Sequence, residues 1–321
     1  MLFNEQISRK PDLYPWTKEY IKTIHAGFWT HDEFSFSSDL QDFHVVLTEQ
    51  EREMVVRTLS AIAQIEVAVK TFWTKLGDNL PHPSIADLGV VIGGSEVIHS
   101  NAYLRLLEVL GIEDTFEENL KLECISGRVN YLKKYTHRFY KDSKKQYIYA
   151  LILFTLFVEN VSLFSQFYVI LWLGRYRNVL KDTNQQITYT KNEELLHSKV
   201  GIKLINTIKK EYPELFDQDL KDKIMHEAHE AYKAECKIVD WMLADYVGPR
   251  ISPDILKGFI QSRINESLHD IGYDQPYLIK EEIERDFEWV NEEILGNNAA
   301  DFFNSKPTDY SKVLVDENDL I

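Results

Sequence analysis

Two stretches of the sequence place a glutamate three residues before a histidine inside an apolar, helix-forming run. The first pair is Glu96 and His99 in SEVIHSNAYLRL, and the second is Glu194 and His197 in KNEELLHSKVG. Residues three or four apart share one face of a helix, so Tyr103 projects from the same face as Glu96 and His99. Burying a carboxylate and an imidazole costs free energy unless a partner compensates them. We therefore expect both pairs to face a partner supplied by the rest of the chain.

Two further glutamates lie in apolar helical stretches, each ahead of one Glu-x-x-His pair: Glu66 in AIAQIEVAVK and Glu159 in TLFVENVSLF. This order of donors matches the ligand set of ferritin-like carboxylate bundles. Taken singly, a buried Glu or His is more often a satisfied structural group. Four buried carboxylates against two imidazoles, however, make sense only around cations, and this donor set suits iron or manganese. The predicted metal ligands are Glu66, Glu96, His99, Glu159, Glu194 and His197.

Other groups of polar residues favour simpler interpretations. The segment MHEAHEAYKAE contains His226, Glu227, His229 and Glu230, but its spacing is not HExxH and no matching second helix follows. We expect a solvated or inter-helix polar face there. Cys124 and Cys236 are predicted to be free thiols. The residues Lys133, Lys134, His137 and Arg138 are predicted to form a charged surface.

Composition restricts the classes of function. The 321 residues carry a formal net charge of −15, which argues against nucleic acid or an anionic membrane as partner. Two cysteines without a regular framework and an N-terminal segment without a hydrophobic signal core predict a reduced, cytoplasmic protein. The apolar run 146–173 could be mistaken for a membrane span, but Glu159 and Asn160 lie at its centre. A buried core helix is the less costly interpretation.

The chain is predicted to be all-α, a bundle of long helices. Thr48 and Glu51 form a capping box before one helix, while Pro81 and Pro83 precede another that ends at Gly111. Further helices are expected at about 12–28, 115–138, 145–173, 184–211, 215–246, 252–270 and 279–295. One domain is predicted over residues 1–303, followed by a flexible, acidic C-terminal tail over 304–321.

With these residues in place, most of the chain resembles the radical-generating small (beta) subunit of class I ribonucleotide reductase. The likeness is carried by GFWTHDEFSFSSD, SEVIHSNAYLRLL, LFVENVSLFSQF, NEELLHSKVG and a tyrosine-bearing tail. It implies a homodimer that works with a separate large (alpha) subunit, into which the tail docks. It also implies a relay from the metal pair through His99 and Glu193 to Trp29, with Tyr310 in the tail as its outer end and Tyr103 as the radical position.

Several positions depart from the best-known diiron members of that family. Glu66 stands where they have aspartate, Leu163 where many have phenylalanine, and Glu193 where an aspartate is usual. Lys70 lies one turn after Glu66; it either hydrogen-bonds a ligand or water at the metal pocket or extends outward to solvent. These features look more like the dimanganese subgroup, class Id. The expected cofactor is two transition-metal ions per chain, with two Mn favoured over two Fe or Mn/Fe. A ferritin-like storage protein and a ligand-binding dimetal oxidase remain the alternative functions.

Overall fold

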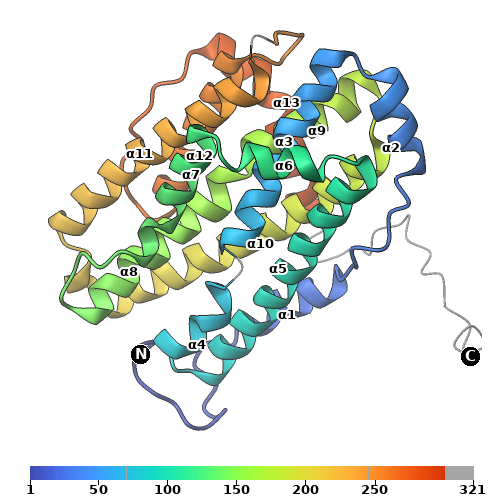
Figure 1. Ribbon diagram of the computed structural model, residues 1–321. Coiled ribbons are helices and arrows are strands. Elements are labelled where there is room, and N and C mark those ends of the chain that lie inside the picture. The colour runs from blue at the N-terminus through green and yellow to red at the C-terminus, as the bar shows by residue number, and fades with distance from the viewer. Residues whose placement is uncertain (70, 245, 301–321) are drawn as a thin grey trace, which may run out of the picture.

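The computed structural model describes residues 1–69, 71–244 and 246–300, and the side chains of these residues except 67–69 and 295–300. The regular elements of this part of the chain are all helices (Figure 1). The fold is the predicted ferritin-like bundle. The α-helices are α1 (Thr17–Ala26), α2 (Ser37–Gln41), α3 (Glu49–Val69), α4 (Leu76–Asn79), α5 (Pro83–Leu110), α6 (Glu113–Asn119), α7 (Glu123–Leu132), α8 (Ser143–Leu153), α9 (Phe164–Trp172), α10 (Lys181–Glu211), α11 (Gln218–Leu243), α12 (Pro253–Asp270) and α13 (Glu281–Ala300). The predicted tail, 304–321, lies outside the described residues.

Four helical segments form the centre of the bundle. These are α3, α5, α10 and the π-helical stretch Phe154–Ser162 between α8 and α9. α5 packs against α3 and α10, and the π-helical stretch packs against α10. They meet near the middle of the molecule in Figure 1, so side chains that point inward from all four converge there.

The predicted helix ends on either side of this centre are confirmed. The Glu51 amide donates to Thr48 Oγ1 at 3.3 Å, while the Thr48 amide donates to Glu51 Oε2 at 3.0 Å, which closes the capping box before α3. α5 begins at Pro83 and ends at Gly111, whose φ of +69° lies in the left-handed region that glycine adopts without steric cost. These caps fix the start of α3, which carries Glu66, and the end of α5, which carries Glu96 and His99.

Three predicted helices need correction. The segment 115–138 forms two helices, because α6 packs on α3 whereas α7 packs mainly on α11, and Leu122 between them is extended. The segment 145–173 is not one regular α-helix, since the π-helical stretch interrupts it. The first helix begins only at Thr17, after Pro11 and Pro15, which disfavour helix at the residues before them.

The apolar segment is part of the core. Within the described residues, the helical span Ser143–Arg177 is long and apolar enough to cross a membrane by length and composition alone. Its most apolar window is entirely buried inside the protein. The prediction of a core helix is confirmed.

A buried ion pair fastens α7 to this core. Arg128 is fully buried and donates from Nε to Glu235 Oε1 of α11 at 3.0 Å. Its other nitrogens donate to the Ala61 carbonyl and to Gln166 Oε1, and also to the carbonyl of Ser162 at the end of the π-helical stretch. One side chain thus ties four segments, α3, the π-helical stretch, α9 and α11, to α7.

Replacing Glu235 with alanine is expected to lower the free energy of unfolding by about 3–5 kcal/mol, because Arg128 would keep a buried charge without its counter-ion. The control is Glu53→Ala, which removes the exposed pair with Arg57 at 2.8 Å and should cost less than about 1 kcal/mol. Denaturant unfolding of both variants measures the difference. If both variants lose the same free energy of unfolding, the buried pair between Arg128 and Glu235 is no more important for stability than an exposed pair.

Candidate metal centre

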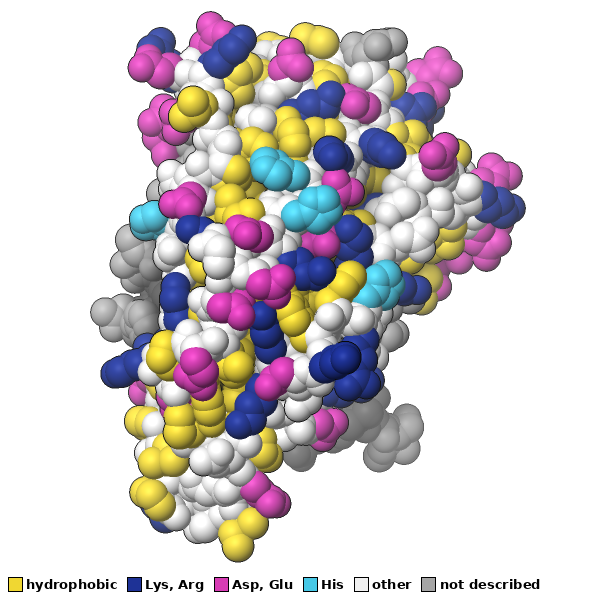
Figure 2. Space-filling model, turned by 90° about the vertical axis from the view of Figure 1, so that its left-hand side faces the viewer, with side chains coloured by type: hydrophobic (Ala, Val, Ile, Leu, Met, Phe, Trp, Pro, Cys, Tyr) yellow, Lys and Arg dark blue, Asp and Glu magenta, His cyan; other side chains and the backbone are white. Residues whose placement is uncertain are grey.

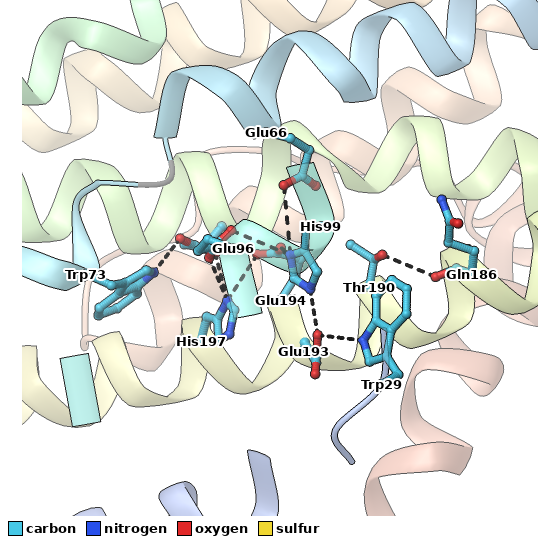
Figure 3. Close-up of polar contacts among 11 residues, drawn as sticks. Trp29, Glu66, Trp73, Glu96, His99, Gln186, Thr190, Glu193, Glu194 and His197 are labelled. Atoms are coloured by element: carbon cyan, nitrogen blue, oxygen red, sulfur yellow. Dashed lines mark hydrogen bonds and ion pairs between the residues drawn. The ribbon is translucent and has the colours of Figure 1, made fainter. Parts of the chain in front are cut away.

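Six buried side chains converge between the four central segments (Figure 3). They form two groups whose potential ligand atoms lie within 4.8 Å of one another: Glu66, Glu96, His99 and Glu194 in the first, and Glu96, Glu159, Glu194 and His197 in the second. These are the six residues that the sequence pattern singled out. Glu96 and Glu194 belong to both groups, so they stand between two neighbouring positions.

The shared carboxylates each face both imidazoles. His99 Nδ1 lies 3.0 Å from Glu194 Oε1 and 3.5 Å from Glu96 Oε2. His197 Nδ1 lies 3.0 Å from Glu96 Oε1 and 3.5 Å from Glu194 Oε2. Each shared carboxylate thus turns one oxygen toward each histidine, which is the arrangement of a carboxylate that bridges two cations.

Several of these atoms lack a hydrogen-bond partner within the described part of the chain. They include both carboxylate oxygens of Glu66, Glu96 Oε1, Glu194 Oε1 and the Nδ1 atoms of His99 and His197. Buried polar atoms are nearly always satisfied in folded proteins. Unsatisfied carboxylate oxygens and imidazole nitrogens that point at a common centre fit two transition-metal ions.

The ionisation of the cluster follows from its burial. Burial raises the pKa of Glu66 and the pKa of Glu159 well above the usual glutamate value. Burial acts in the same direction on Glu194, but the polar side chains of Glu159, His197 and His99 around it outweigh burial and hold the pKa of Glu194 well below that value. Glu66 and Glu159 therefore need added positive charge nearby to ionise. Metal ions bound there would displace protons from the cluster.

Burial alone would lower the pKa of each histidine, but the surrounding carboxylates reverse this. The hydrogen bond to Glu193 and the nearby carboxylates of Glu194 and Glu96 raise the pKa of His99 well above its usual value. The nearby carboxylates of Glu159, Glu194 and Glu96 do the same to the pKa of His197. The carboxylates therefore favour a positive charge on each imidazole ring, next to the positions where cations would lie.

A hydrogen-bonded chain leads from this cluster to a buried tryptophan. His99 presents Nδ1 to the cluster, and its Nε2 lies 2.6 Å from Glu193 Oε2. Trp29 Nε1 donates to the same oxygen at 3.1 Å, and the Trp29 and His99 rings are stacked with centroids 6.1 Å apart. Figure 3 shows Glu193 between the two rings. The structure therefore places Trp29, Glu193 and His99 in the order that the resemblance implied.

Tyr103 lies on α5 in the interior beside the cluster. Its ring is buried, and burial together with the nearby Glu66 carboxylate raises the pKa of its phenol well above the usual value. Thr190 lies near the hydroxyl, for which no hydrogen-bond partner is found among the described residues. The phenol is thus close to the first group of ligands but is not hydrogen-bonded to a ligand carboxylate.

Two of the predicted site residues, Lys70 and Tyr310, lie outside the described residues. The competing polar segment does not join the cluster. His226 and His229 are exposed, while the buried Glu227 accepts a hydrogen bond from Lys134 at 2.8 Å. Cys124 and Cys236 are free, as predicted.

Sequence reasoning missed Trp73. Its Nε1 donates to Glu159 Oε1 at 2.7 Å, and both side chains are buried. Trp73 begins a short 3₁₀ helix, Trp73–Lys75, between α3 and α4, where the sequence has no periodic pattern that would predict the direction of its side chain. Only tertiary packing brings it to the cluster.

The fold and this buried carboxylate and histidine cluster define a ferritin-like helical protein with a site of the dimetal type. The family model for the ribonucleotide reductase small chain matches residues 7–284, and the chain belongs to this family.

Relatives are distant but similar over nearly their full length. The ribonucleoside-diphosphate reductase subunit beta of Halalkalibacterium halodurans is 23% identical over 94% of this chain and 88% of its own length. The ribonucleotide reductase R2 subunit from Clostridium botulinum superposes with a TM-score of 0.76 at 18% identity, over 88% of each chain. An R2-like ligand-binding oxidase with an Mn/Fe cofactor gives 0.70 at 20% identity, over 82% of this chain and 95% of its own. These structural likenesses establish the fold.

Proposed function

We propose that this chain is the radical-generating small subunit of a class I ribonucleoside-diphosphate reductase, active only together with a large subunit that reduces ribonucleotides to deoxyribonucleotides. The observation that carries the proposal is the hydrogen-bonded chain from His99 through Glu193 to Trp29. A storage protein would need the six ligands but no such connection. The family membership supports the same assignment.

In this proposal two metal ions would be held by six residues, of which Glu96 and Glu194 belong to both ligand groups: Glu66, Glu96, His99, Glu159, Glu194 and His197. Once oxidised, such a pair supplies one oxidising equivalent. His99 connects the cluster to Glu193, and Glu193 Oε2 accepts the indole N–H hydrogen bond of Trp29, so this chain would hold the indole proton in place when the ring is oxidised. The burial of Trp29 at 2% exposure keeps water away from the ring. Tyr310 in the tail would continue the path to the large subunit.

Two manganese ions are the favoured cofactor within this proposal. Glu66 is longer than the aspartate of the best-known diiron members, and the Tyr103 hydroxyl is not hydrogen-bonded to any ligand carboxylate among the described residues. Both features favour storage of the equivalent on the metals over storage on Tyr103. Two iron ions or one of each metal are the alternatives.

The proposed homodimer has support from an exposed face of α5. Val90, Val97 and Leu104 follow one another at intervals of seven residues and are each more than half exposed, at 63%, 52% and 51%. Such a spacing aligns them along one side of the helix. An apolar line on the helix that carries Glu96 and His99 fits the same face of a second copy.

The partner and location follow from the same assignment. We propose a large subunit as the partner and the cytoplasm as the location. On the face shown in Figure 2, Lys and Arg side chains are interspersed with Asp and Glu. Together with the net charge of −15, this mixture supports a protein partner over nucleic acid.

Deleting residues 305–321 tests the proposed function against its alternatives. We expect loss of turnover with the large subunit, because the tail supplies both docking and Tyr310, while metal content per chain stays at the wild-type value. Assays of deoxyribonucleotide formation and of metal content on the same preparations measure both. An R2-like oxidase, favoured by the fold similarity alone, would have little use for the tail. Full turnover and unchanged partner binding after the deletion would contradict the proposal.

A further inference from the structure

Glu159 differs from the other glutamates of the cluster because a tryptophan hydrogen-bonds it from outside. Trp73 Nε1 donates to Glu159 Oε1 at 2.7 Å, and the other oxygen, Oε2, lies 3.7 Å from His197 Nδ1. The two oxygens of this carboxylate therefore have different neighbours. One faces the indole and the other faces the second group of ligands.

The backbone that carries Glu159 is held in place by side chains from α12. Arg263 Nε donates to the Asn160 carbonyl at 3.1 Å and a second nitrogen of Arg263 donates to the Asn160 side chain. Ser267 Oγ accepts from the side-chain Nδ2 of Asn160 and donates to the Leu156 carbonyl. These bonds satisfy polar groups in the π-helical stretch, where the regular helical pattern is altered. What remains adjustable at Glu159 is the side chain.

The Trp73 ring is itself tightly held. Its edge packs against Phe72 and Phe154, with centroid distances of 5.6 and 5.8 Å. α5 crosses so close that a Cβ added at Gly89 would lie 2.5 Å from the Trp73 carbonyl oxygen. The N–H of Trp73 is thus a donor at a fixed place, aimed at one oxygen of an otherwise movable carboxylate.

We propose that Trp73 is a positioning residue that keeps Glu159 a one-oxygen ligand of the second metal position, the one formed by Glu96, Glu159, Glu194 and His197. The indole N–H occupies Oε1 and turns Oε2 toward His197. The ligand class is a divalent transition metal such as Mn²⁺. This inference rests on the proposed dimetal function and adds the residue that distinguishes the second position from the first.

The experiment is titration of the metal-free full-length chain with Mn²⁺, with free and bound ions counted by equilibrium dialysis. In Trp73→Phe, one of the two ions should bind about 10–100-fold more weakly, as is typical when an outer partner of a metal ligand is lost. The other ion should bind as in the wild type. A second variant carries at position 73 a tryptophan analogue with sulfur in place of the indole N–H, which keeps the packing and removes only the donor. It should show the same loss.

Trp172→Phe is the matched control. Trp172 is buried to a similar degree, and its Nε1 donates to the Pro249 carbonyl at 2.8 Å, away from the metal ligands. This variant should bind both ions like the wild type. Thermal unfolding of the metal-free proteins shows that each variant is folded before titration.

Unchanged binding of both ions in the two Trp73 variants would overturn the Trp73 assignment alone, and so would an equal weakening of both ions or the same loss in Trp172→Phe. Fewer than two ions bound per wild-type chain would overturn the proposed dimetal centre and the Trp73 assignment with it. The two failures are therefore distinguishable from the wild-type titration.

Discussion

Glu194→Ala is expected to abolish the dinuclear centre, so that the chain no longer holds two metal ions and turnover with the large subunit falls at least about 1000-fold, which is about 4 kcal/mol of activation free energy. Glu194 belongs to both ligand groups and lies 3.0 Å from His99 Nδ1. Its loss takes one oxygen from each position at once. Metal analysis of the purified variant and a turnover assay measure the two effects.

The matched control for this prediction is Glu227→Ala. Glu227 is also a buried glutamate, exposed by only 4%, but it lies on α11 and pairs with Lys134 outside the cluster. This variant should lose stability and keep two metal ions. Wild-type metal content in Glu194→Ala would contradict the prediction that Glu194 is a ligand in both metal positions.

Trp29→Phe is expected to separate metal binding from turnover. The variant keeps all six ligands and an aromatic ring of similar packing, but it loses the N–H that Glu193 Oε2 accepts at 3.1 Å and replaces an oxidisable indole. Turnover should fall by about 100-fold or more, equivalent to about 2.7 kcal/mol, while metal content stays unchanged. Both quantities are measured on the same metal-loaded preparation with the large subunit in excess.

Trp289→Phe makes the same chemical change elsewhere in the core. Trp289 is buried and donates from Nε1 to the Tyr168 hydroxyl at 3.1 Å. It should leave turnover close to wild type. If Trp29→Phe lowers turnover no further than Trp289→Phe does, Trp29 is a packing residue and the relay is wrong.

The ligand cluster could be predicted because its residues form local patterns in the sequence. Glu96 with His99 and Glu194 with His197 each share one helix face, and a charged pair inside an apolar run stands out against its surroundings. The caps at Thr48 and Gly111 are local as well, which explains why the predicted ends of α3 and α5 agree with the structure.

The features that escaped prediction depend on contacts distant in sequence. Trp73 meets Glu159 across 86 residues, and Arg263 meets Asn160 across 103. The π-helical stretch around Glu159 is stabilised by such long-range donors. The apolar run 146–173 has the pattern of one continuous helix, so it could not predict this interruption. Arg128 is a similar case, because a single arginine in a short helix gives no sign that it reaches Glu235 in the core.

The most direct test of the central claim is electron paramagnetic resonance of the manganese-loaded, oxidant-activated protein, with metal content counted in the same sample. We expect two metal ions per chain and a manganese multiplet from the coupled pair, with no signal from a Tyr103 radical. Fewer than two ions per chain, or a sharp organic doublet that disappears in Tyr103→Phe, would contradict it.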